Sequence, residues 1–273
     1  MTHQRAKRTA EGFAHVFSAL SVVPTAMSRE EIRRRALKRP DSWWVVLVID
    51  PIALRLLPFL LRFPKVTPVR VTGFAAALGI GSVASFASGH LVLGAALFEL
   101  RFFFDCIDGK LARVLGLTSD RGAFLDLASD IVLINTCIGA LAWHLAPTAR
   151  GAGGADVVPL ALAGPCLLAG FVLYWLILWD LSHAVSPTEV PSHQQQSWLR
   201  RHGLHRLPRT VEVETFLLFI APLTGSTAVL RGAFAVALAY FALASVNLAT
   251  RIYRTSLPSQ PADGGGVATT GST

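Results

Sequence analysis

The stretch from Asp105 to Asp130 constrains the fold most, because it sets four carboxylates into two otherwise apolar segments. The pattern predicts two helices joined by a short polar bend. Asp105 and Asp108 are three residues apart and therefore share one helical face. Gly122, Asp126 and Asp130 recur at intervals of four and form a single stripe on the next helix. If the two helices pack antiparallel across the bend, all four carboxylates converge.

Converging carboxylates repel one another unless a cation neutralises them. Divalent cations that prefer oxygen ligands do this best, so the pattern favours Mg²⁺ or Mn²⁺. Charged residues within strongly apolar helices are costly and usually mark a functional site. The alternative is a solvated helix end whose acidic side chains face water.

The composition places this site in a membrane protein. Of 273 residues, 52% are hydrophobic and only 15% are charged, which is typical of a multipass membrane chain and not of a soluble domain. The net charge of +8 indicates membrane topology and contact with anionic lipid, and no nucleic-acid partner is expected. Cys106, Cys137 and Cys166 lie in apolar segments without ligand spacing, so we expect buried free thiols.

The order of apolar segments predicts an all-α integral membrane fold with six transmembrane helices after an interfacial amphipathic helix. A capping box at Ser28–Glu31 predicts the start of a basic helix that runs to Arg39. Residues 43–63 contain Trp43-Trp44, several charges and two prolines, which favours a helix lying in the headgroup layer over one that spans. The expected spans are residues 69–89, 91–114, 122–146, 157–179, 211–229 and 232–252.

These segments divide the chain into four parts. We expect a cytosolic basic segment at 1–42, the interfacial helix at 43–65, the six-helix domain at 66–254 and a disordered tail at 255–273. Six spans place both termini on one side, and the loops on that side hold most of the arginines, whereas the opposite loops hold only Arg150 and Arg231. We therefore predict a multi-pass protein of the cell membrane with both termini and the carboxylates on the cytoplasmic side.

The spacing D-x2-D-G-x2-A-R-x8-G-x3-D-x3-D is met at every fixed position between residues 105 and 130. It resembles the signature of the CDP-alcohol phosphotransferase (CDP-alcohol phosphatidyltransferase) family of integral membrane enzymes. The resemblance implies metal-dependent transfer of a phosphoalcohol from a CDP-alcohol to an acceptor hydroxyl, with release of CMP, in phospholipid biosynthesis. The commonest donor in the family is CDP-diacylglycerol, which supplies a phosphatidyl group to a polar acceptor.

The resemblance also assigns roles to the residues of the motif. It implies that two ions, Mg²⁺ or Mn²⁺, clamp the diphosphate, and that one carboxylate takes the proton of the acceptor hydroxyl. The implied metal ligands are Asp105, Asp108, Asp126 and Asp130, and the implied catalytic base is Asp130. The implied donor-binding residues are Gly109, Ala112, Arg113 and Gly122.

Several of these residues have alternative roles. The small residues Gly109, Ala112 and Gly122 allow close approach of a nucleotide, but small residues also let membrane helices pack tightly. Arg113 can reach phosphate oxygens or can serve as a snorkelling arginine at a helix end. Arg101, one turn before Asp105, is either part of an internal ion pair or a ligand for an anionic headgroup or acceptor phosphate.

Other hypotheses remain open from the sequence. The donor and acceptor can be reversed, with a small CDP-alcohol and a lipid hydroxyl. A UbiA-type prenyltransferase also binds metal-diphosphate through aspartates, and a cation transporter would also place acids in its spans. The 183–209 segment carries four histidines without ligand spacing, so it predicts a basic loop touching lipid phosphate over a metal site. A homodimer is expected only by analogy with the family.

Overall fold

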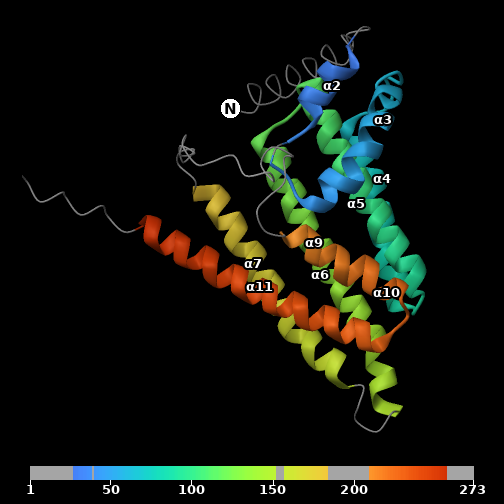
Figure 1. Cartoon of the computed structure of the whole chain (residues 1–273), viewed down its shortest axis with the longest axis vertical. Coiled ribbons are helices and arrows are strands. Elements are labelled where there is room, and N and C mark those ends of the chain that lie inside the picture. Colours follow the sequence, from blue (N-terminus) through green and yellow to red (C-terminus); the bar gives the residue numbers. More distant parts are fainter. Residues whose placement is uncertain (1–26, 39, 152–156, 184–208, 257–273) are drawn as a thin grey trace, which may run out of the picture.

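The computed structural model describes residues 27–38, 40–151, 157–183 and 209–256, and the elements within them are helices (Figure 1). The predicted all-α class is therefore confirmed. Helical segments at Pro68–Ala87, Gly122–Leu145 and Thr227–Arg254 are long and apolar enough to cross a membrane. The described part of the chain thus contains three candidate membrane-spanning helices.

The first described helix, α2, spans Arg29–Ala36 and starts where the capping motif predicts. The Ser28 side chain accepts a hydrogen bond from the Glu31 backbone N–H at 3.1 Å, which satisfies one exposed donor of the first turn. Glu31 also accepts hydrogen bonds from Arg34 and Arg35, and these lower the pKa of its carboxyl. The helix ends at Ala36, earlier than predicted, and Arg39 lies outside the described residues.

Two π-helical turns interrupt otherwise α-helical segments, and each precedes a proline by two residues. The turn η1 (Val45–Ile49) leads into α3 (Asp50–Leu60), whose second residue is Pro51. The turn η2 (Phe216–Ile220) joins α9 (Thr210–Thr215) to α10 (Ala221–Leu223), whose second residue is Pro222. A proline cannot donate to the carbonyl four residues earlier, and the residue before it bonds instead to the carbonyl five residues back.

Helix α4 (Pro68–Ala87) packs against both helices that carry the acidic motif, α5 (Leu91–Leu115) and α6 (Asp120–Gly151). Gly79 leaves room for α6 to approach α4, because an added Cβ would lie 2.7 Å from the end of the Leu133 side chain, which would then have to shift. Helix α5 ends at Gly116, whose φ of 68° is the left-handed conformation that closes a helix without strain only in glycine. The predicted bend between the two motif helices is therefore present.

The remaining long helices, α7 (Val157–His183) and α11 (Thr227–Ser256), pack against each other across the lower part of the molecule in Figure 1. The prediction for 211–229 was wrong at its end, because the helix stops at Leu223. Gly225 then adopts a left-handed φ of 63°, and α11 begins at Thr227. The predicted tail at 255–273 lies outside the described residues beyond Ser256.

Candidate active site

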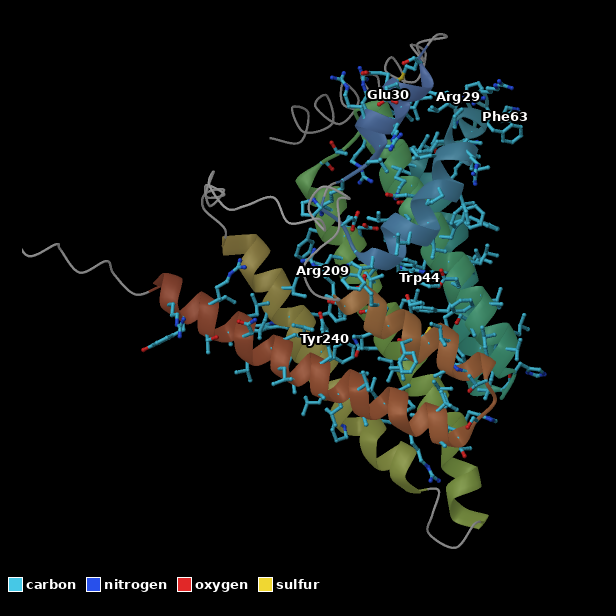
Figure 2. The ribbon with its side chains drawn as sticks, in the orientation of Figure 1. Arg29, Glu30, Trp44, Phe63, Arg209 and Tyr240 are labelled. Atoms are coloured by element: carbon cyan, nitrogen blue, oxygen red, sulfur yellow. The ribbon has the colours of Figure 1, made fainter. Side chains whose placement is uncertain are left out.

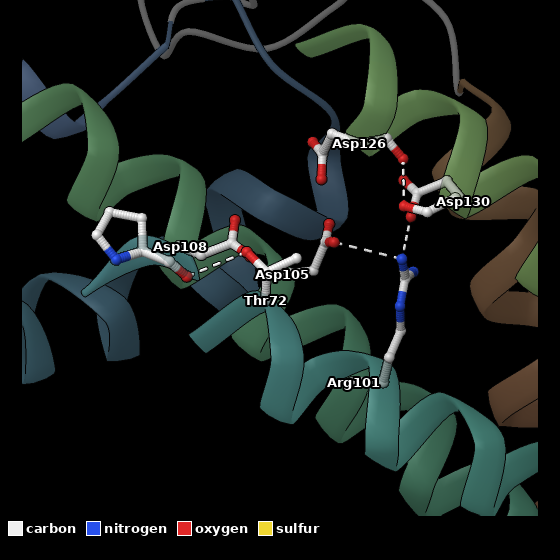
Figure 3. Close-up of polar contacts among 8 residues, drawn as sticks. Thr72, Arg101, Asp105, Asp108, Asp126 and Asp130 are labelled. Carbon is white, nitrogen blue, oxygen red and sulfur yellow. Dashed lines mark hydrogen bonds and ion pairs between the residues drawn. The ribbon is translucent and has the colours of Figure 1, made fainter. Parts of the chain in front are cut away.

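The four aspartates of the motif lie at the space between α5 and α6. Figure 3 shows Asp105 and Asp108 of α5 on one side and Asp126 and Asp130 of α6 on the other. The pair α5 and α6 is not among the extensively packed helix pairs of the described residues, and α4 bridges them instead. The two pairs of carboxylates thus lie on either side of a space between α5 and α6, and these helices do not pack closely against each other as the predicted antiparallel arrangement requires.

Arg101 connects the two halves of the motif. Its guanidinium donates to an oxygen of Asp105 at 3.3 Å, and it also pairs with Asp130 on the facing helix (Figure 3). The Arg101 side chain is only 4% exposed, so this is a buried ion pair with two carboxylates. Of the two roles that the sequence left open for Arg101, the structure contains the internal ion pair.

Thr72 supports Asp108 from the third helix. Its hydroxyl lies 2.6 Å from the Asp108 Oδ2 atom, and it is also 3.0 Å from the backbone carbonyl of Pro68 (Figure 3). Asp108 is 5% exposed, so a hydrogen bond to its carboxylate carries weight. Sequence reasoning missed Thr72. Its position near the start of α4, one helical turn after Pro68, is the feature of the sequence that could have suggested a polar contact there.

Sequence reasoning also missed several buried polar contacts around the motif. Lys110 pairs with Asp50 at 3.0 Å, and both side chains are almost fully buried. The Trp44 indole N–H donates to Glu99 at 2.8 Å. The Tyr174 hydroxyl donates to Glu214 of α9. These contacts join segments far apart in the chain, which helical periodicity cannot predict.

A single carboxylate, that of Glu212, joins the beginnings of two helices. Its Oε1 atom accepts from the backbone N–H of Trp43 at 2.5 Å and of Trp44 at 3.4 Å. Its Oε2 atom accepts from the backbone N–H of Arg209 at 2.6 Å, at the start of its own helix. Because unpaired N–H groups at a helix start favour an anion, Glu212 stabilises both ends at once.

The predicted donor-binding residues occupy the motif helices without tight interhelical packing. A Cβ on Gly109 would meet only the Arg113 guanidinium at 3.5 Å, which is ordinary contact, and one on Gly122 would lie 3.1 Å from the Ser119 hydroxyl. Close helix packing therefore does not explain these two glycines among the described residues. The Arg113 Nε–H donates to the Ala36 carbonyl at the end of α2 at 2.9 Å.

The aspartates suit a hard divalent cation by their chemistry, since all four offer carboxylate oxygens and lie close to one another in Figure 3. Asp105 and Asp130 are 13% and 24% exposed, so a cation can reach them from outside the helix packing. Within the described residues, however, no three acidic, histidine or cysteine side chains close around one point. Arg101 supplies the positive charge beside Asp105 and Asp130 in this arrangement.

Comparison with known proteins decides the family. Residues 65–245 match the CDP-alcohol phosphatidyltransferase family, a segment that covers more than half of the chain and includes all of the motif. The chain belongs to this family. The match decides against the two alternative hypotheses, a UbiA-type prenyltransferase and a cation transporter.

Two relatives are phosphatidylinositol phosphate synthases. The one from Corynebacterium glutamicum is 33% identical over 100 residues, which cover 36% of this chain and 43% of the relative. The one from Streptomyces avermitilis is 35% identical over 94 residues, which cover 34% of this chain and 36% of the relative. The matched segments thus span less than half of either relative's length.

A solved structure is also similar to this chain. It is the Mycobacterium tuberculosis phosphatidylinositol phosphate synthase with CDP-DAG bound, which is 22% identical with a TM-score of 0.49. The alignment covers 76% of this chain and 92% of that one. The histidines at 193, 202 and 205, for which the sequence weighed a metal site against a lipid-contacting loop, lie outside the described residues.

Proposed function

We propose that this chain is a CDP-alcohol phosphatidyltransferase that transfers a phosphatidyl group from CDP-diacylglycerol to an acceptor hydroxyl and releases CMP, in phospholipid biosynthesis. Membership of the family supports the reaction class. The observation that carries the proposal is that Arg101 joins Asp105 of one motif helix to Asp130 of the other. Carboxylates from both halves of the motif therefore belong to one site.

The chain's own residues divide the work of this reaction. Asp105, Asp108, Asp126 and Asp130 would hold two divalent cations, Mg²⁺ or Mn²⁺, which would supply charge neutralisation for the diphosphate of the donor. Asp130 accepts the proton of the acceptor hydroxyl, since it lies at the edge of the quartet and is the most accessible of the carboxylates that Arg101 contacts. Thr72 orients Asp108 through the hydrogen bond to its Oδ2 atom.

Donor binding involves the surfaces beside the carboxylates. Gly109, Ala112 and Gly122 present little side chain, so a nucleotide can approach the backbone there. Arg113 donates to the Ala36 carbonyl on the side of α5 that contacts α2 and α3, so its donor-binding role remains a prediction from the family motif. Arg101 contributes positive charge near the acceptor side, beside Asp130.

The acceptor is a polar alcohol. The names of the two curated relatives favour an inositol phosphate, whereas the absence of lysine and arginine from residues 157–179 speaks against a second phosphate site on that helix. The reverse arrangement, a small CDP-alcohol with a lipid hydroxyl, is the second candidate because the same motif serves both directions.

The decisive experiment is a CMP-release assay on the purified protein. CDP-diacylglycerol is offered with inositol phosphate, inositol, glycerol phosphate and serine, and small CDP-alcohols are offered with diacylglycerol. We expect CMP release with CDP-diacylglycerol and one polar acceptor, its loss in EDTA, and its recovery on adding excess Mg²⁺ or Mn²⁺. Release that persists in EDTA would contradict the metal role, and no release with any pair would contradict the reaction.

We further propose that the protein crosses the cell membrane six times, through α4, α5, α6, α7, the helical segment 210–223 and α11. The predicted interfacial helix at 43–60 starts beside Glu99, within α5, and runs along α5 toward its cytoplasmic end, as the positions of Trp44 and Phe63 in Figure 2 show. Leu47, Ile52 and Phe59 are exposed apolar side chains of this helix that can face lipid. Both termini and the carboxylates then face the cytoplasm. The four-part division at residues 42, 65 and 254 and the homodimer remain predictions.

Substituted cysteines test this topology. Ser88, before α5, and Thr118, in the bend before α6, are both exposed and lie at opposite ends of α5. We expect Ser88→Cys to react with a membrane-impermeant maleimide in intact cells, and Thr118→Cys to react only after permeabilisation. The unsubstituted protein, whose Cys137 and Cys166 are buried, gives the background. The reverse labelling pattern would place the carboxylates outside the cell.

A further inference from the structure

The N-terminal unit, comprising α2, η1 and α3, is fastened to α5 at three places. Ala36 of α2 accepts from Arg113 at 2.9 Å, Asp50 of α3 pairs with Lys110 at 3.0 Å, and Trp44 donates to Glu99 at 2.8 Å. Figure 1 shows this unit lying along the upper part of α5. Helix α5 therefore contacts the N-terminal unit in addition to carrying Asp105 and Asp108 toward α6.

The three attachment points form one stripe along α5. Glu99, Lys110 and Arg113 are separated by eleven and three residues, about three turns and about one turn of an α-helix. Arg101 follows Glu99 by two residues and therefore lies roughly 200° around the helix. Asp105 and Asp108 continue the Arg101 stripe at spacings of four and three. One side of α5 thus bears the catalytic carboxylates, and the opposite side bears the contacts to the N-terminal unit.

Most of the remaining contact between the unit and α5 is apolar. Ala53 and Leu57 of α3 are fully buried in one cluster with Ile107 and Leu111 of α5. Apolar attraction is non-directional, so such a surface tolerates small rotations and shifts of one helix against the other. A buried charge pair does not, because a displaced lysine or aspartate would be left without its counter-charge.

The pair Asp50–Lys110 is the polar contact at the middle of this surface. The Lys110 side chain is 3% exposed and that of Asp50 is 6% exposed, so neither charge is compensated by water. Lys110 stands two residues after Asp108, within the motif, yet it points to the opposite side of the helix. A large rotation of the helix segment that carries Asp105 and Asp108 would therefore move Lys110 away from Asp50.

We propose that Asp50 and Lys110 are positioning residues of the phosphatidyltransferase site, which fix the register of α5 so that Asp105 and Asp108 face α6. This inference rests on the proposed function for its catalytic consequence. The pair contacts neither donor nor acceptor, and it acts through the orientation of the motif helix.

The test is a double-mutant cycle read in three ways: melting temperature from tryptophan fluorescence, Mn²⁺ binding by EPR without substrate, and kcat and KM for CMP release. Asp50→Leu and Lys110→Met each leave one buried charge unpaired, and we expect each to lower the melting temperature by roughly 10 °C. The double variant replaces both charges with apolar groups, so its melting temperature should return to within about 3 °C of the unsubstituted protein.

Function should not return with stability in the double variant. Because a small misplacement of catalytic groups is costly, we expect its kcat to stay about tenfold or more below that of the unsubstituted protein. Its Mn²⁺ affinity should be weaker by roughly tenfold, as is usual when support of metal ligands is lost. Lys110→Arg keeps the charge and should retain most of both properties.

The exposed pair Glu31–Arg35 on α2 provides the matched control. Arg35→Met removes an ion pair of the same chemistry at the surface, and it should change neither melting temperature nor kcat measurably. A stable double variant with full kcat and Mn²⁺ affinity would overturn the positioning role. A double variant as unstable as the single ones would overturn the pairing, and the melting temperatures report this even if no acceptor supports CMP release.

Discussion

Asp130→Asn should abolish CMP release, by about 10³-fold or more, while the protein remains folded. The substitution keeps the size of the side chain and removes its capacity to take a proton. Arg101 retains Asp105 as a partner in this variant, so its charge stays compensated and the buried arginine is tolerated. The measurement is the initial rate of CMP release at saturating donor, together with the melting temperature of the same preparation.

Thr136→Val is the control for Asp130→Asn. Thr136 lies on the same helix, α6, where it is exposed and bonded only to its own helix through the Val132 carbonyl at 2.6 Å. The Thr136→Val variant should release CMP at the same rate as the unsubstituted protein. If Asp130→Asn also releases CMP normally, the proton acceptor of the reaction is another group.

Arg101→Met should destabilise the protein strongly, because it leaves Asp105 and Asp130 facing each other without the guanidinium. Removal of one partner from a buried ion pair costs about 3 kcal/mol or more. For a chain of this size the melting temperature should fall by roughly 10 °C in metal-free buffer. Thermal unfolding followed by tryptophan fluorescence measures the effect.

Two further conditions separate charge from geometry at Arg101. Arg101→Lys keeps one positive charge but lacks the planar guanidinium, so it pairs less well with Asp105 and Asp130 at the same time. We therefore expect a melting temperature between those of Arg101→Met and the unsubstituted protein. Excess Mg²⁺ should restore part of the stability of Arg101→Met, since a divalent cation also neutralises the carboxylates. An Arg101→Met protein as stable as the unsubstituted one would show that the ion pair contributes nothing to folding.

Local spacing predicted the contacts that are local in the chain. Arg101 and Asp105 are one helical turn apart, so their shared face follows from the period of the α-helix, and the ion pair was one of two predicted roles. The bend between the motif helices and the facing of Asp105 toward α6 also follow from spacing. The family motif added the roles of the aspartates, which spacing alone does not define.

Partners distant in sequence could not be predicted in the same way. Thr72 and Asp108 are 36 residues apart, and Asp50 and Lys110 are 60 apart. Periodicity reports which face of a helix is buried, but not which helix covers it. The end of the segment 211–229 was missed for a different reason. The polar run Thr224-Gly225-Ser226-Thr227 is a turn signal, but apolar residues on both sides of it favoured one continuous span.

The Glu212 carboxylate has a consequence for how the protein is made. It accepts the backbone N–H of Trp43, 169 residues earlier in the chain, and so completes the start of a helix that leaves the ribosome long before it. Domains usually fold from the N-terminus as synthesis proceeds. Here the N–H groups at the start of the helix at 43–60 gain this partner only after the chain has been synthesised as far as Glu212.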